Sequence, residues 1–142
     1  MTKSIEHKTV SITQLENDTI LFKLKENSII ELEDSKKMYE ETMQLSQGRK
    51  YASLVDARAI VTLTKEAREW SANPELHKNL IAQAIVINSL ANRIVGNFII
   101  RFHKPKAPTR LFSSMEKAKE CLQERLKDYS EKKNSMSVKS FV

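Results

Sequence analysis

The sequence predicts an α/β domain built around one mixed, mostly parallel sheet. Two short and mostly apolar runs, at residues 51–57 and 82–87, are typical of strands that are covered on both faces. Segments with helical spacing separate these runs, and strands separated in this way normally pair in parallel through right-handed crossovers. Only two glycines and three prolines occur in 142 residues, which argues against a loop-rich or all-β chain.

The first third of the chain predicts a β-hairpin and then a helix. Residues 10–15 alternate loosely between apolar and polar, and residues 20–24 alternate strictly. Asn17 and Asp18 supply a turn between them, so the hairpin becomes the antiparallel edge of the sheet. Helical spacing follows over residues 33–47, and Gly48 marks the C-terminal stop.

The middle of the chain alternates strands with shorter helices. After the strand at 51–57, Thr64 is placed to cap a helix that runs through Trp70. Asn73 and Pro74 restart a short helix, with proline at the first helical position. The second buried strand, at 82–87, comes next.

The last third predicts two further helices around a short strand. Ser89 caps a helix with a broad apolar face, and residues 109–112 form the last strand. Ser113 or Ser114 then caps a final helix that ends near Tyr129. The prediction is therefore one domain over residues 1–129 with four main helices. The polar and patternless residues 130–142 are predicted to be a disordered tail.

Composition limits the class of protein. Hydrophobic content of 40% with 30% charged residues is typical of a soluble globular domain. No apolar run approaches the roughly 20 residues that span a bilayer, and the N-terminus lacks the apolar core of a signal peptide. Cys121 is the only cysteine, which excludes an internal disulfide and favours a reducing cytoplasm.

One stretch carries an excess of positive charge. Between Glu75 and Glu116 there is no acidic residue, and its six cations equal the whole net charge of +6. We expect a basic patch around the proline-bounded loop there, suited to an acidic partner or an anionic membrane. Its residues are Arg101, His103, Lys104, Lys106 and Arg110. A helix dipole explains Arg101 and His103 but not the absence of acids. Nucleic acid is not expected, because the nearby phenylalanines lie at core spacing.

A second group of polar residues follows the strands of the predicted sheet. The carboxyl ends of parallel strands and the starts of the following helices meet at one edge, where anions and other ligands collect. We expect a partner-binding or anion-binding edge made of Asp56, Arg58, Thr64, Asn88, Ser89, Asn92 and Arg93. The alternative, which we favour, is that Asp56 and Arg58 pair locally and that the hydroxyls only cap helices.

Signatures of catalysis are missing from the sequence. His7, His77 and His103 lie far apart without metal-ligand spacing, and no glycine-rich phosphate loop or Gly-x-Ser-x-Gly motif occurs. We therefore predict no catalytic residue, no metal and no cofactor.

The order of elements resembles the STAS domains and their SpoIIAA-like relatives over residues 8–128. The strand and turn at residues 53–60, which read Ser-Leu-Val-Asp-Ala-Arg-Ala-Ile, are the best local match. Small uncharacterised bacterial proteins of this superfamily are a closer match, because they carry segments like those at residues 96–98, 104–105 and 108–112.

This resemblance implies regulation through protein contacts, switched by phosphorylation at the start of the helix after the third strand. Family members carry Asp-Ser-Ser-Gly or a similar sequence there. This chain has Thr64, Lys65, Glu66 and Ala67, so the usual phosphoacceptor is absent and Thr64 is interpreted as a cap. The related CRAL-TRIO domains imply a lipid cavity, which Trp70, Phe98, Ile99 and Phe102 could line, although a packed core is the favoured interpretation.

The sequence therefore predicts a non-enzymatic, cytoplasmic STAS-like domain that binds a protein partner. A small apolar or phosphorylated ligand such as a lipid, and attachment to anionic membrane through residues 101–110, are the alternatives. A homodimer through an exposed hairpin edge is a further possibility.

Overall fold

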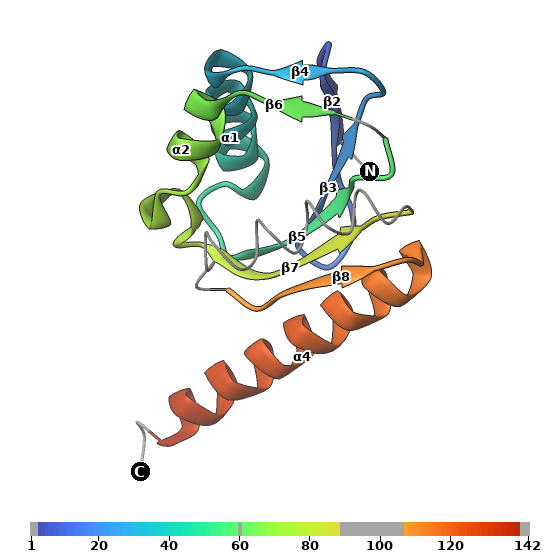
Figure 1. Cartoon of the computed structure of the whole chain (residues 1–142). Coiled ribbons are helices and arrows are strands. Elements are labelled where there is room, and N and C mark those ends of the chain that lie inside the picture. Colours follow the sequence, from blue (N-terminus) through green and yellow to red (C-terminus); the bar gives the residue numbers. More distant parts are fainter. Residues whose placement is uncertain (1–2, 60, 89–106, 140–142) are drawn as a thin grey trace.

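The computed structural model describes residues 3–59, 61–88 and 107–139. Its main sheet has six strands in the order β1-β2-β3-β5-β7-β8 (Figure 1). In chain order these are β1 (Lys3–Glu6), β2 (Val10–Gln14), β3 (Thr19–Leu24), β5 (Tyr51–Asp56), β7 (Leu80–Val86) and β8 (Thr109–Phe112).

The N-terminal strands form the antiparallel part of the sheet, as expected. β2 pairs with β3, and Asn17 and Asp18 between them both adopt left-handed backbone conformations, with φ of 61° and 56°. Asparagine and aspartate tolerate this conformation better than other non-glycine residues. The sheet has one strand more than the predicted hairpin, because β1 pairs with β2 from Lys3 to Glu6 and becomes the edge.

The remaining strands pair in parallel. β3 pairs with β5, β5 with β7 and β7 with β8, so these four strands follow one another across the sheet in chain order. Leu54 lies opposite Ala84 and Val55 opposite Ile85, which confirms the predicted parallel pairing of the two buried strands. The predicted strand at residues 109–112 is also confirmed.

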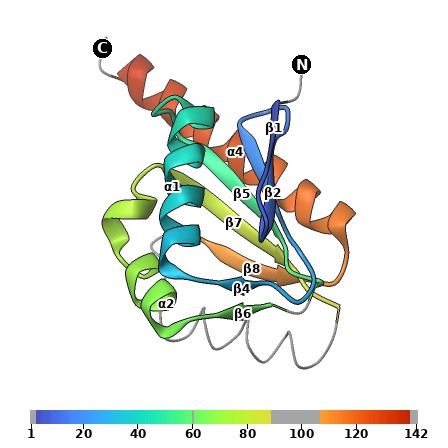
Figure 2. The same cartoon turned by 90° about the horizontal axis from the view of Figure 1, so that it is seen from above.

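Helices cover both faces of the sheet. α1 (Leu32–Ser46) and α2 (Lys65–Ser71) lie on one side, and α4 (Met115–Lys139) lies on the other (Figures 1 and 2). A 3-10 turn, η1 (Pro74–His77), follows α2 as predicted from Asn73 and Pro74. The helix expected from Ser89 lies outside the described residues, so the structure tests three of the four expected helices.

Alternation along the strands divides the core into two parts. On β5, Ala52 and Leu54 pack toward α4 in a cluster that also contains Ala84, Ala118 and Leu122. Alanines at three of these positions let the helix approach the strands closely. On the other face a second cluster joins the hairpin to α1 and consists of Val10, Ile12, Ile20, Leu45 and Tyr51.

Two further features, besides β1, were not predicted. A two-stranded parallel ladder joins β4 (Ile29–Ile30) to β6 (Thr62–Leu63), where the sequence showed only a continuing apolar run. α4 continues through Lys139, although we expected it to end near Tyr129 and residues 130–142 to be a tail. Residues 130–139 contain no proline or glycine, and Glu131, Lys132 and Lys133 favour helix, so nothing stops its propagation.

Candidate functional site

Asp56 ends β5 at the carboxyl edge of the sheet, where the sequence predicts the partner-binding or anion-binding edge. Only 5% of this residue is exposed, so its charge requires a partner. Arg58 supplies one: its Nε donates to Oδ1 at 2.9 Å, its Nη2 donates to Oδ2 at 2.8 Å, and its backbone N–H donates to Oδ1 at 3.2 Å. Asp56 and Arg58 therefore pair locally, which is the interpretation that we favoured from the sequence.

This pairing sets the protonation of Asp56. The hydrogen bonds from the Arg58 side chain lower the pKa of the Asp56 carboxyl below its usual value, against burial, which raises it. The same contacts raise the pKa of the Arg58 guanidinium. A carboxylate held ionised in this way is a poor proton donor or acceptor near neutral pH, because general catalysis needs a pKa close to the working pH. The pair is suited to holding the turn after β5.

Thr64 is the N-cap of α2, as predicted. Its hydroxyl oxygen accepts a hydrogen bond from the backbone N–H of Ala67 at 3.2 Å, and its own backbone is extended. Its backbone N–H donates to the carbonyl of Ile30 at 3.1 Å, next to the β4–β6 ladder. Thr64 therefore connects the start of a helix to the small second sheet.

Asn88 follows β7 at the same edge as Asp56, and the two strand ends are joined by the Ala57 N–H donating to the Val86 carbonyl at 2.9 Å. Asp56 ends β5, while Arg58 and Asn88 follow β5 and β7, so the three residues lie at the ends of neighbouring parallel strands, as predicted. The other expected members of this edge, Ser89, Asn92 and Arg93, lie outside the described residues.

The predicted basic patch is described at one position only. Arg110 lies on β8, is exposed, and places its guanidinium carbon 5.4 Å from the centre of the Phe112 ring. That distance is within the range of a cation–π contact. Arg101, His103, Lys104 and Lys106 lie outside the described residues, so the patch stays a prediction.

A cavity of about 560 Å³ lies between the sheet and the helices α1 and α2. Phe22, Val55 and Ile85 contribute apolar side chains from three neighbouring strands. The helical side contributes Met38 and Tyr39 from α1, and Trp70 from α2. The rings of Tyr39 and Trp70 meet edge to face, with centroids 5.9 Å apart and planes at 84°, so they join the two helices at the cavity. Of the residues that the sequence named for an apolar cavity, only Trp70 is described, and it does line this one.

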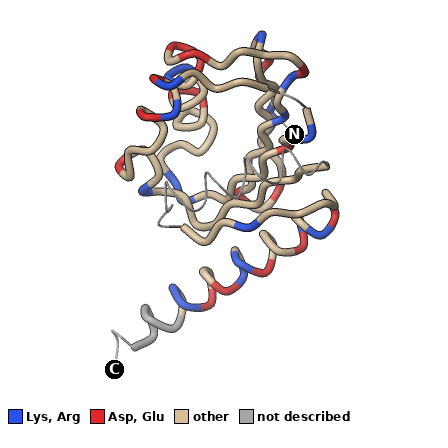
Figure 3. Tube along the Cα trace, in the orientation of Figure 1, with Lys and Arg blue, Asp and Glu red and all other residues tan. Residues whose placement is uncertain are grey.

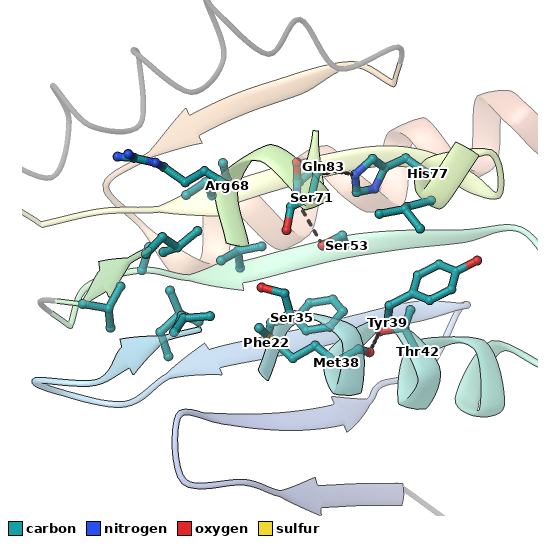
Figure 4. A pocket seen from close by; sticks show the side chains of 18 of the residues that line it. Phe22, Ser35, Met38, Tyr39, Thr42, Ser53, Arg68, Ser71, His77 and Gln83 are labelled. Atoms are coloured by element: carbon teal, nitrogen blue, oxygen red, sulfur yellow. Dashed lines mark hydrogen bonds between the residues drawn. The ribbon is translucent and has the colours of Figure 1, made fainter. Parts of the chain in front are cut away.

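A few polar groups lie among these apolar side chains. Ser53 of β5 and Gln83 of β7 face each other, with Gln83 Nε2 at 3.5 Å from Ser53 Oγ (Figure 4). Thr42 already donates to the Met38 carbonyl at 2.7 Å, and His77 contacts the Ser71 carbonyl at 2.7 Å. The contact between Ser53 and Gln83 is the longest of these three, so among these groups they are the best placed to meet a polar atom of a ligand.

Sequence reasoning missed most of this cavity. The sequence contains part of the pattern that indicates a cavity. Tyr51, Ser53 and Val55 share one face of β5, and Ser53 places a hydroxyl on a face that is otherwise expected to be apolar. α1 also had a thin apolar stripe, and two of its small polar residues, Ser35 and Thr42, line the cavity. Neither observation identifies a cavity until the facing elements are known.

Among the described residues, no group of three or more His, Cys, Asp or Glu side chains is arranged to hold a metal ion. Within the same residues, no helix combines the length and the apolar character needed to cross a bilayer.

The fold defines an α/β domain of the SpoIIAA-like type. An uncharacterised protein of the DUF3478 family from Shewanella loihica PV-4, with a SpoIIAA-like fold, superposes with a TM-score of 0.62 at 15% sequence identity. The match covers 86% of this chain and 95% of the other. At this identity the likeness shows the fold alone.

The chain belongs to the family of domains of unknown function DUF7793, whose model matches residues 13–126. No curated protein matches it.

Proposed function

We propose that this domain acts by binding, without catalysis, and that its cavity holds a small apolar molecule. The observation that carries the proposal is the cavity of about 560 Å³ between the sheet and α1 and α2. Ligand sites commonly have volumes of roughly 300–1,000 Å³ and combine apolar walls with a few polar groups that fix orientation. Ser53 and Gln83 supply such groups here.

The lining indicates the chemistry of the ligand. Arg68 is the only fully charged residue among the described lining residues, and its exposed side chain extends away from the cavity centre (Figure 4). A phosphate in the interior would lack a cation there, and burying it would be costly. The proposed ligand is therefore a largely apolar molecule with one uncharged hydrogen-bonding group, which Ser53 and Gln83 meet.

Trp70 makes this proposal testable without a label. It is the only tryptophan of the chain and it lines the cavity, so its emission reports an occupant. We expect dodecanol to shift the emission of Trp70 in a saturable way. Native mass spectrometry should show a small molecule retained by the purified protein, or bound dodecanol once dodecanol has been added. A clean apo mass together with unchanged Trp70 emission rules out the ligand.

A matched pair of variants separates the cavity from nonspecific apolar binding. Ser35 is buried on α1 and lines the cavity, so Ser35→Leu should fill part of it and weaken dodecanol binding. Lys37 is exposed on the same helix, and Lys37→Leu should leave binding unchanged. Circular dichroism confirms that both variants fold. Equal binding by both would place the ligand elsewhere.

A regulatory contact with a protein partner is the second candidate. The SpoIIAA-like fold supports this role. A cationic groove beside α4 offers a surface that could contact such a partner. A pull-down from native lysate tests this role, independently of the cavity.

A further inference from the structure

A groove runs between the second half of α4 and the amino ends of the parallel strands. It lies at the opposite end of β5 from Asp56, because Arg49 and Lys50 precede that strand and Asp56 ends it. It also lies on the α4 side of the sheet, away from the cavity. Its volume is about 700 Å³. We call it the α4 groove, and it is lined by Asn17, Asp18, Gly48, Arg49, Lys50, Ile81, Gln123, Leu126, Lys127, Tyr129, Ser130 and Lys133.

The α4 groove is strongly cationic. Arg49, Lys50, Lys127 and Lys133 line it, against the single carboxylate of Asp18. That carboxylate is 3.9 Å from Arg49, and both side chains are more than half exposed, so solvent screens the pair. Among the described residues, Lys127 and Lys133 have no acidic group within 4.0 Å. Their charge is therefore available to an acidic partner.

The position of residues around α4 explains this charge. Cations and acids both occur along the helix, as Figure 3 shows. Gln123, Lys127, Ser130 and Lys133 recur at helical spacing and share the face that lines the groove. The acids Glu124, Asp128 and Glu131 recur at the same spacing one position further on and so share a different face. None of those acids lines the groove.

The floor of the groove is apolar. Ile81 of β7 and Leu126 of α4 are only partly buried, and both pack against the core cluster between the sheet and α4. Tyr129, half-buried, lies one helical turn beyond Leu126 and adds an amphipathic side chain. Apolar side chains surrounded by cations form a site for a ligand that is apolar at its centre and anionic around it.

We propose that the α4 groove binds an acidic peptide segment of a protein partner, with an apolar side chain of that segment seated against Ile81 and Leu126. The cations around the groove attract an acidic segment at long range and fix its register along the groove. The apolar contact with Ile81 and Leu126 adds specificity. Nucleic acid fits less well, because a phosphate backbone gains nothing from the apolar contact with Ile81 and Leu126. This inference deepens the protein-binding candidate and is independent of the cavity.

The test measures fluorescence anisotropy with a short fluorescein-labelled peptide of glutamates around a central pair of leucines. Lys127→Glu combined with Lys133→Glu should weaken binding by about tenfold, because two attractive contacts become repulsive. The matched control is Lys117→Glu with Lys119→Glu, which makes the same charge change on exposed positions near the start of α4, away from the groove. It should weaken binding by less than about threefold, because salt screens distant charges.

Three further results decide the assignment. Replacing the leucines of the peptide by serine should weaken binding, and equal binding would remove the apolar contact from the proposal. Single-stranded DNA of the same length should bind more weakly than the peptide, and tighter DNA binding would overturn the assignment to a protein segment. Equal losses in the two double variants would show nonspecific charge attraction.

Two measurements separate this groove from other interfaces. Sedimentation of the free protein should show a monomer, and a dimer that the groove variant dissociates would instead make a second copy of this chain the occupant. If the groove variant captures the same protein from a lysate as the wild type does, protein binding is supported but the α4 groove is not its site.

Discussion

Arg58 donates from Nε and Nη2 to the two carboxylate oxygens of Asp56, at 2.9 and 2.8 Å, across two positions of sequence. The carboxylate is buried and the guanidinium is about half exposed. The chain can therefore turn directly after β5 while the negative charge of Asp56 stays balanced by Arg58. At this part of the edge, the side chains of Asp56 and Arg58 are engaged with each other.

Arg58→Ala should destabilise the fold by about 1–3 kcal/mol at neutral pH, because it leaves a buried carboxylate with one backbone donor. The pKa of Asp56 is lowered in the folded state, so its contribution is present above the unfolded pKa and is lost as pH falls through the folded value. The difference between wild type and variant in urea unfolding should therefore shrink below about pH 4. Arg49→Ala, which removes an exposed pair, should change stability by under about 0.5 kcal/mol. A pH-independent cost at Arg58 would contradict the pairing.

Tyr51 should ionise at a higher pH than an ordinary tyrosine phenol. Burial raises the pKa of its phenol from 10.0 to about 12. The unfolded chain then loses this proton first, so stability is present below pH 10 and falls as pH rises toward 12. In absorbance of tyrosinate, the difference between wild type and Tyr51→Phe should show one phenol that ionises near pH 12. A difference that instead shows ionisation near pH 10 would mean that Tyr51 is accessible to solvent.

The cap at Thr64 predicts a graded series. Thr64→Ala should cost about 1 kcal/mol, because the Ala67 N–H loses its acceptor, and Thr64→Ser should be near neutral because the hydroxyl remains. Chemical denaturation measures both. If serine cost as much as alanine, the threonine methyl group would matter more than the cap. Phosphate on Thr64 in cells would overturn its assignment as a cap alone.

Close packing of α4 on the sheet predicts the effect of added volume at Ala118. This residue is fully buried in one cluster with Ala52, Ala82 and Ala84. Ala118→Leu should destabilise by about 1–3 kcal/mol, because the helix must move away from the strands. Glu120→Leu adds leucine on an exposed position of the same helix and should change stability by under about 0.5 kcal/mol. Equal thermal midpoints would show room between α4 and the sheet.

Local patterns predicted most of the elements. The strands at 51–57, 82–87 and 109–112, the turn at Asn17 and Asp18, and the cap at Thr64 each depend on residues within a few positions. Periodicity and capping are properties of such short windows, so one sequence carries them. The loss of an apolar stripe predicts that α4 ends near Tyr129, whereas helix propensity alone continues it through Lys139.

By itself, the sequence determined the β2–β3 hairpin, the parallel pairing of β5 with β7, the pairing of Asp56 with Arg58 and the cap at Thr64. Only the tertiary structure decided the β4–β6 ladder, the cavity and the α4 groove. Each of these joins side chains from elements far apart in the chain. Which faces meet, and what space or charge they leave between them, depends on packing that no short window contains.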